Sequence, residues 1–142
     1  LYHCDHDDIY QVKVFVHISD VDMSAGPLTV IPAKLSRELR RKLNYRFGYE
    51  GRINDEEIRS LVPAGSEHAL TGPSGAIFLV DPCQAFHFGS RATTKDRYVV
   101  VFQYMTLTNF VYNPFYQFSP YPFAPFVKPH HNKVQRAVLD PA

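Results

Sequence analysis

The sequence lacks tryptophan, has only two cysteines among 142 residues, and contains no long apolar run. Cys4 and Cys83 are too few for a disulfide framework, so we expect a reducing compartment such as the cytoplasm, with a single bridge between them left open. No stretch approaches the roughly 20 apolar residues of a membrane-spanning helix, and no signal peptide is visible, so we expect no membrane partner.

Neither sign of charge is in excess, since 15 Lys and Arg residues face 14 Asp and Glu residues and the net charge is +1 with neutral histidines. No basic field is available, which argues against a nucleic-acid partner. Apolar residues are plentiful at 45%, with 11 Phe and 9 Tyr, so the chain can close one core and is not expected to be disordered. The chain starts at Leu1 without a methionine, and we expect its natural N-terminus, and a missing N-terminal region, to lie upstream.

Alternating β-branched residues predict a half-buried strand over 10–18, with Tyr10 and Val12 on one face and Gln11 and Lys13 on the other. Further strands are expected over 28–31, 67–71, 75–81 and 97–107. Two helices are expected in one insertion: one within 34–47 with Ser36 as its N-cap, and one from Asn54 or Asp55 to Pro63. This mainly-β pattern with a short helical insertion favours an antiparallel sandwich or barrel of the jelly-roll kind.

The pattern changes at Asn113, after which proline and phenylalanine alternate. We therefore predict a β core over 1–112 and a Pro/aromatic-rich C-terminal arm over 113–142. Proline at this density blocks the interiors of helices and sheets. An extended tail that packs its aromatic side chains on its own domain is favoured over an arm that docks a partner or covers the site.

Metal-capable side chains crowd the segment 2–8, which reads Tyr-His-Cys-Asp-His-Asp-Asp. Residues i and i+2 of an extended segment point the same way, so His3 with Asp5, or His6 with Asp8, could reach one ion. His87, beside an apolar strand, is the best candidate for a third ligand. Two histidines and one carboxylate on one face hold Fe(II) in non-haem oxygenases. A histidine-rich surface turn explains the spacing equally well.

Arg97 lies ten residues after His87, at the start of an expected strand. A guanidinium forks onto a carboxylate with two hydrogen bonds, so Arg97 suits one end of a dicarboxylate, although an exposed strand-start charge is the simpler alternative. Arg91 is a competitor, but its loop favours solvation. Outside this group, His17 is expected to be hydrogen-bonded or exposed. Surface positions are expected for His68, His130 and His131, and turn-capping roles for Asp20 and Asp22.

In order, these segments resemble the phytanoyl-CoA dioxygenase-like proteins of the Fe(II)/2-oxoglutarate oxygenase superfamily. The resemblance covers roughly 2–108 and is carried by His3-Cys4-Asp5-His6-Asp7-Asp8, Val12-Lys13-Val14-Phe15, Ser19-Asp20-Val21-Asp22, Gly26-Pro27-Leu28-Thr29-Val30-Ile31-Pro32, Gly75 to Asp81, His87 and Arg97. The ordered series is far more specific than any single member.

The resemblance implies a double-stranded β-helix, a cupin-like jelly-roll barrel with iron at its open end. It implies that His3, Asp5 and His87 bind Fe(II), and that Arg97 pairs with the distal carboxylate of 2-oxoglutarate. It further implies a dioxygenase that hydroxylates a small organic substrate while converting 2-oxoglutarate to succinate and carbon dioxide, with ascorbate as an auxiliary reductant. Related halogenases lack the carboxylate, so Asp5 argues for hydroxylation.

Two departures from the family pattern are visible. Many relatives follow Ile-Pro with Gly-Ser-His, where this chain has Ala33-Lys34-Leu35-Ser36, and many have Gln between the first two ligands, where this chain has Cys4. The Cys4 thiol is expected to be inert packing, with self-oxidation as the alternative. The insertion 34–66 is the expected substrate determinant, since loops at a barrel mouth commonly set specificity.

Two other functions stay open at the level of sequence. One is a catalytically silent jelly-roll module, or truncated fragment, that binds a ligand or partner. The other is a cupin-like metal protein that does not use 2-oxoglutarate. Nothing in the sequence indicates the prime substrate or the oligomeric state.

Overall fold

A computed structural model describes residues 1–48, 51–91, 94–106 and 124–139. The chain divides into two compact units, Leu1–Val111 and Tyr112–Ala142. None of the described helices is both long and apolar enough to cross a membrane.

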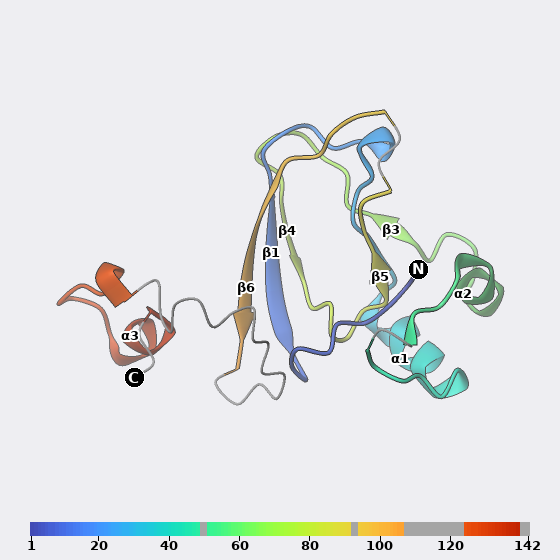
Figure 1. The fold of residues 1–142 in the computed structure, drawn as a ribbon, viewed down its shortest axis with the longest axis horizontal. Coiled ribbons are helices and arrows are strands. Elements are labelled where there is room, and N and C mark those ends of the chain that lie inside the picture. Colours follow the sequence, from blue (N-terminus) through green and yellow to red (C-terminus); the bar gives the residue numbers. More distant parts are fainter. Residues whose placement is uncertain (49–50, 92–93, 107–123, 140–142) are drawn as a thin grey trace. The chain divides into compact units, whose positions relative to one another are not determined.

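Two antiparallel sheets of three strands each form the first unit (Figure 1). In one sheet, β1 (Gln11–His17) lies between β4 (Ile77–Val80) and β6 (Val99–Met105). In the other, β2 (Thr29–Val30) lies between β3 (His68–Ala69) and β5 (His87–Phe88). The paired sheets agree with the expected β architecture in its coarse form, but the strands of the described ranges do not close into a barrel.

The first helix differs from its expected bounds. The helix α1 runs over Ala33–Lys42, and Ser36 lies buried inside it, where its hydroxyl donates to the Ile31 carbonyl at 2.9 Å. The prediction of Ser36 as N-cap was therefore wrong. The N-cap is Pro32, which follows β2 closely, and the helix starts at the next residue. The helix stops before 47 because Asn44 takes a left-handed backbone conformation, with φ 45°.

The second helix follows its expected chemistry. The helix α2 spans Asp55–Leu61, and the Asn54 side chain caps it by accepting from the Glu57 amide at 2.8 Å. Three acidic residues occupy its first turn, where negative charge is favoured. A short 3-10 turn, η1 (Met23–Ala25), is capped in the same way by Asp22, which confirms the structural role expected for that carboxylate.

The buried core of the first unit lies between the helices and the sheet of β2, β3 and β5. Its members come from the N-terminal segment, β2's end, both helices and the approach to β5, and are Tyr2, Cys4, Ile31, Leu39, Ile58 and Phe86. Tyr2 and Cys4 therefore anchor the N-terminal segment by its even-numbered side chains. The odd-numbered side chains, His3 and Asp5 among them, point the other way.

The sheet of β4, β1 and β6 has two unlike faces. One face carries aliphatic and aromatic side chains, which include the exposed Val12, Leu79, Phe102 and Tyr104. The other face carries Gln11 and Lys13 from β1, together with His17. His17 is buried, and its ring centroid lies 5.1 Å from that of Phe78. Of the two alternatives expected for His17, hydrogen-bonded or exposed, exposure was therefore wrong, and its buried Nδ1 has no hydrogen-bond partner among the described residues.

The second unit contains η4 (Ala124–Phe126) and the helix α3 (Lys133–Leu139). An extended tail was expected here, and for Lys133–Leu139 that expectation was wrong. The reason is local, since no proline occurs between Pro129 and Pro141 and Asn132 caps the first turn by accepting from the Gln135 amide. Residues 113–123 and 140–142 of the predicted arm lie outside the described residues.

Replacing Ile31 by valine tests the position of this core. Ile31 is 0% exposed, and loss of one buried methylene should lower the free energy of unfolding by about 0.5–1.5 kcal/mol. The same substitution at Ile77, which is 59% exposed, should change it by less than about 0.5 kcal/mol. Urea denaturation of both variants measures the difference, and equal losses would contradict the placement of the core.

Candidate metal centre

An isolated antiparallel bridge between His3 and His87 holds the N-terminal segment beside β5. His3 donates its amide to the His87 carbonyl at 3.1 Å, and His87 returns the bond to the His3 carbonyl at 2.9 Å. Asp5 donates to the Pro82 carbonyl at 2.9 Å. These backbone bonds bring residues 77 to 84 positions apart in sequence into register, and they place the three predicted ligands on one surface.

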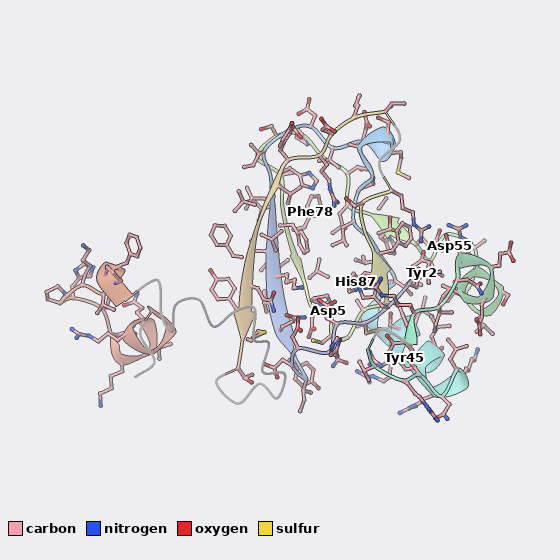
Figure 2. The ribbon with its side chains drawn as sticks, viewed as in Figure 1. Tyr2, Asp5, Tyr45, Asp55, Phe78 and His87 are labelled. Carbon is pink, nitrogen blue, oxygen red and sulfur yellow. The ribbon has the colours of Figure 1, made fainter. Side chains whose placement is uncertain are left out.

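The side chains of His3, Asp5 and His87 converge. Nε2 of His3 lies 3.7 Å from Oδ1 of Asp5, and Nε2 of His87 lies 3.5 Å from the same oxygen. The two imidazole rings have their centroids 4.4 Å apart. Figure 2 shows Asp5 and His87 side by side between the two sheets, while Tyr2 and Tyr45 lie toward the helices. One ligand atom from each of the three residues falls within 4.8 Å of the others, so this group could hold a metal ion.

Both imidazoles present Nε2 to the centre for the same local reason. Nδ1 of His87 lies 3.0 Å from the Ala85 carbonyl, and Nδ1 of His3 lies 3.4 Å from the Leu1 carbonyl. In each case the carbonyl belongs to the residue two positions earlier. A neutral histidine that donates from Nδ1 carries a lone pair on Nε2, which is the tautomer that ligates metals. Burial, with the neighbouring His87, lowers the pKa of His3 and favours its neutral form.

The spacing of the donors fits a cation better than a hydrogen-bonded cluster. Contacts of 3.5 and 3.7 Å are longer than normal hydrogen bonds between nitrogen and oxygen. Two donors that each lie about 2.1 Å from an ion, at right angles, are about 3 Å apart. Small side-chain movements would therefore close the group on an ion, and the donor set of two imidazoles and one carboxylate suits iron, zinc, manganese or cobalt.

The second carboxylate oxygen of Asp5 is held from β1. Lys13 places Nζ 2.6 Å from Oδ2, and Gln11 donates from Nε2 to the same oxygen at 3.1 Å. Burial by itself would raise the pKa of Asp5, but His87 and Lys13 outweigh it and hold that pKa well below its usual range. Asp5 is therefore ionised, which a metal ligand requires.

Arg97 lies on the same side of β5 as His87. Gly89 follows His87 by two residues, and a Cβ atom at Gly89 would lie 3.7 Å from Nη2 of Arg97. Within the described ranges Arg97 is half-buried and has no hydrogen-bond or ion-pair partner, and burial lowers the pKa of its guanidinium. A half-buried cation without a described partner gains from a nearby anion, so the surroundings of Arg97 are compatible with the anion-binding role expected for it.

Arg91, the competing arginine, has a structural role. Its guanidinium forks onto the Asp55 carboxylate, with one bond at 2.8 Å, and stacks 3.5 Å from the centre of the Phe88 ring. Arg91 is exposed, as expected, with 40% of its side chain accessible, but the sequence did not show its ion pair, because α2 brings Asp55 to the loop after β5. Arg91 is therefore already paired, whereas no such partner of Arg97 is described.

The alternative ligand pair does not assemble. His6 is exposed, and Asp8 accepts the backbone amides of Ile9 at 2.7 Å and Thr106 at 2.6 Å. Asp8 therefore ties the N-terminal segment to the end of β6. His68, which was expected at the surface, is exposed.

Cys4 and Cys83 are free thiols, each 1% exposed. Cys4 points into the core, away from its neighbours His3 and Asp5, and Nη1 of Arg40 lies 3.7 Å from its sulfur. Burial raises the pKa of the Cys4 thiol to about 12. These features support the prediction that Cys4 is inert packing.

Thiol labelling tests this assignment. At pH 8 the folded chain should react with an aromatic disulfide reagent at least about 100-fold more slowly than the denatured chain, since both thiols are buried and protonated. The denatured chain should release two equivalents. Rapid labelling of Cys4 in the folded chain would show that the segment between His3 and Asp5 opens to solvent.

The helical insertion contributes to the surroundings of the triad. A cavity of about 140 Å³ is lined by His3, Asp5, Asp7, Gly48 and Arg52, together with their neighbours Cys4 and His6. A larger one of about 360 Å³ is lined by the segment from Leu43 to Arg46, the segment from Gly51 to Ile53, and Glu57. Arg52 borders both cavities, so the loop after α1 lies beside the triad.

Lys13 and Gln11 were not predicted as partners of Asp5. A signal was present, because they are polar residues that share one face of a strand rich in apolar residues. Tyr2 was missed as well. It is fully buried, and its hydroxyl donates to Glu67, which also accepts from Nε of Arg59 at 2.9 Å. This bond fixes the residue before His3.

Comparison with known proteins adds no family assignment, since no family model and no curated protein matches this chain.

Proposed function

We propose that this chain is the catalytic core of an Fe(II)/2-oxoglutarate-dependent oxygenase that hydroxylates a small organic substrate. The observation that carries the proposal is the convergence of two imidazole Nε2 atoms on one oxygen of Asp5. This is the ligand set of the non-haem Fe(II) oxygenases, which leaves one face of the metal open. The two three-stranded sheets are proposed to be the facing halves of a double-stranded β-helix.

Each residue has a defined task in this proposal. His3, Asp5 and His87 hold the iron, and the carbonyls of Leu1 and Ala85 orient the two imidazoles. Arg97 pairs with the distal carboxylate of 2-oxoglutarate, whose other end chelates the metal. When bound, the iron supplies the oxidative decarboxylation of 2-oxoglutarate coupled to oxidation of the substrate. The protein contributes the geometry of the open face.

The discriminating experiment is metal-dependent turnover without a prime substrate. Purified chain with Fe(II), ascorbate and 2-oxoglutarate should release succinate slowly, and omission of iron or addition of a chelator should abolish the release. Calorimetry should show that 2-oxoglutarate binds only when a divalent metal is present. Absence of both succinate release and metal-dependent binding would reject the oxygenase in favour of a catalytically silent module.

A metal protein that does not use 2-oxoglutarate would give a third combination of results in these experiments. It would bind one metal ion per chain but show no metal-dependent affinity for 2-oxoglutarate. The half-buried Arg97 is the observation that argues against it.

A further inference from the structure

The two oxygens of Asp5 lie in different surroundings. Oδ1 faces the two imidazole nitrogens at 3.5 and 3.7 Å, whereas Oδ2 is held by Nζ of Lys13 at 2.6 Å and by Nε2 of Gln11 at 3.1 Å. One oxygen is therefore available to a metal, and the other is already occupied by two donors from β1.

Lys13 is placed for this task by the register of its sheet. It lies in the middle of β1, on the same face as Gln11, and is paired with Val80 of β4 and Gln103 of β6. Its side chain is 19% exposed, and Asp5 is the one carboxylate that the described residues place in an ion pair with it. A lysine enclosed in this way stays on its partner rather than in solvent, so it holds Asp5 in one orientation.

A carboxylate can bind a metal through one oxygen or through both. With both, it occupies two coordination positions, and a site with two imidazoles would retain fewer positions for a chelating cosubstrate and for dioxygen. A cation beside the carboxylate also weakens the attraction between the ligand set and a metal ion. Lys13 is thus expected to lower the affinity for the metal and to raise the affinity of the metal-loaded site for the cosubstrate.

We propose that Lys13, assisted by Gln11, is a positioning residue that restricts Asp5 to a single metal-bound oxygen and so reserves coordination positions for the cosubstrate. This inference rests on the proposed oxygenase function. It predicts that removal of the ammonium group strengthens metal binding and weakens 2-oxoglutarate binding in the same protein.

The test uses Lys13→Met, with Co(II) as the metal probe and 2-oxoglutarate as the ligand probe, both titrated by calorimetry on the folded chain. We expect Co(II) affinity to rise about tenfold and the affinity of the Co(II)-loaded chain for 2-oxoglutarate to fall about tenfold, the scale of effects seen when partners of metal ligands are changed. The visible bands of bound Co(II) should also weaken, since their intensity falls as the coordination number rises.

Two further variants separate positioning from simple damage. Lys13→Arg keeps a cationic donor and should restore most of both affinities, whereas Gln11→Met should shift both in the direction of Lys13→Met by a smaller factor. Lys95→Met is the matched control, because Lys95 pairs with Asp22 at a surface site where its side chain is 58% exposed. It should change neither affinity.

The outcomes are distinguishable. If Lys13→Met weakens both affinities, or changes neither, the inference is overturned, and Lys13 is a structural salt-bridge partner only. If the unaltered chain binds Co(II) but shows no metal-dependent affinity for 2-oxoglutarate, the proposed function fails instead. Opposite changes in the two affinities support the inference.

Discussion

Replacing Asp5 by asparagine is expected to reduce metal affinity by at least about 100-fold and to abolish metal-dependent succinate release. The change removes the one anionic ligand and keeps the side-chain shape. The loss should reach at least the upper end of the 10–100-fold changes that follow when a residue behind a ligand is altered, because here the ligand itself is changed. Lys13 would lose its ion pair, so a modest loss of stability should accompany the loss of metal. Calorimetric titration with Co(II) measures the first effect and urea denaturation the second.

The control for this prediction lies two residues away. Asp7→Asn removes the same charge from the same segment, and among the described residues Asp7 accepts one long contact, of 3.4 Å, from Gln103. The metal affinity of Asp7→Asn should stay within about threefold of that of the unaltered chain, since water screens a partly solvated charge that does not touch the ion. Equal losses in Asp5→Asn and Asp7→Asn would mean that the segment attracts cations by charge alone.

Replacing Arg97 by methionine should lower the affinity for 2-oxoglutarate by about 100-fold and leave metal affinity unchanged. Two charge-assisted hydrogen bonds to a carboxylate in a half-buried place are together worth about 3 kcal/mol, which corresponds to that factor. No described residue pairs with the guanidinium, so the folded chain should not be destabilised by its removal. Calorimetry of the Co(II)-loaded variant measures the effect.

Arg91→Met is the matched comparison for Arg97. Arg91 forks onto Asp55 and stacks on Phe88, so its loss should lower stability and change 2-oxoglutarate affinity only a few-fold. A larger loss of 2-oxoglutarate affinity in Arg91→Met than in Arg97→Met would contradict the assignment of the anion site to Arg97 and favour Arg91.

Period-two alternation predicted β1 closely, and capping chemistry predicted the start of α2 at Asn54. Alternation could not predict β5, because its two residues are too few to show a period. Ser36 was misplaced because a serine that bonds to the carbonyl five residues earlier resembles an N-cap in sequence. These errors arise where tertiary contacts override local preference.

In the candidate site, too, local patterns predicted some features and tertiary contacts determined the others. Spacing allowed both His3 with Asp5 and His6 with Asp8, and only the burial of Tyr2 and Cys4 against the helices determines which set of side chains faces away from the core. The backbone pairing of His3 with His87 joins positions far apart in sequence, so no local pattern encodes it. The role of Lys13 required the register of β1 against its neighbours, which is a property of the folded sheet.

The most direct measurement of the central claim is the position of a bound metal ion. Crystals grown with Mn(II) and examined by anomalous diffraction should show one ion per chain, bound by Nε2 of His3, Nε2 of His87 and Oδ1 of Asp5. An ion held instead by His6 and Asp8, an ion at His130 and His131, or no ion at any of these side chains would contradict the account.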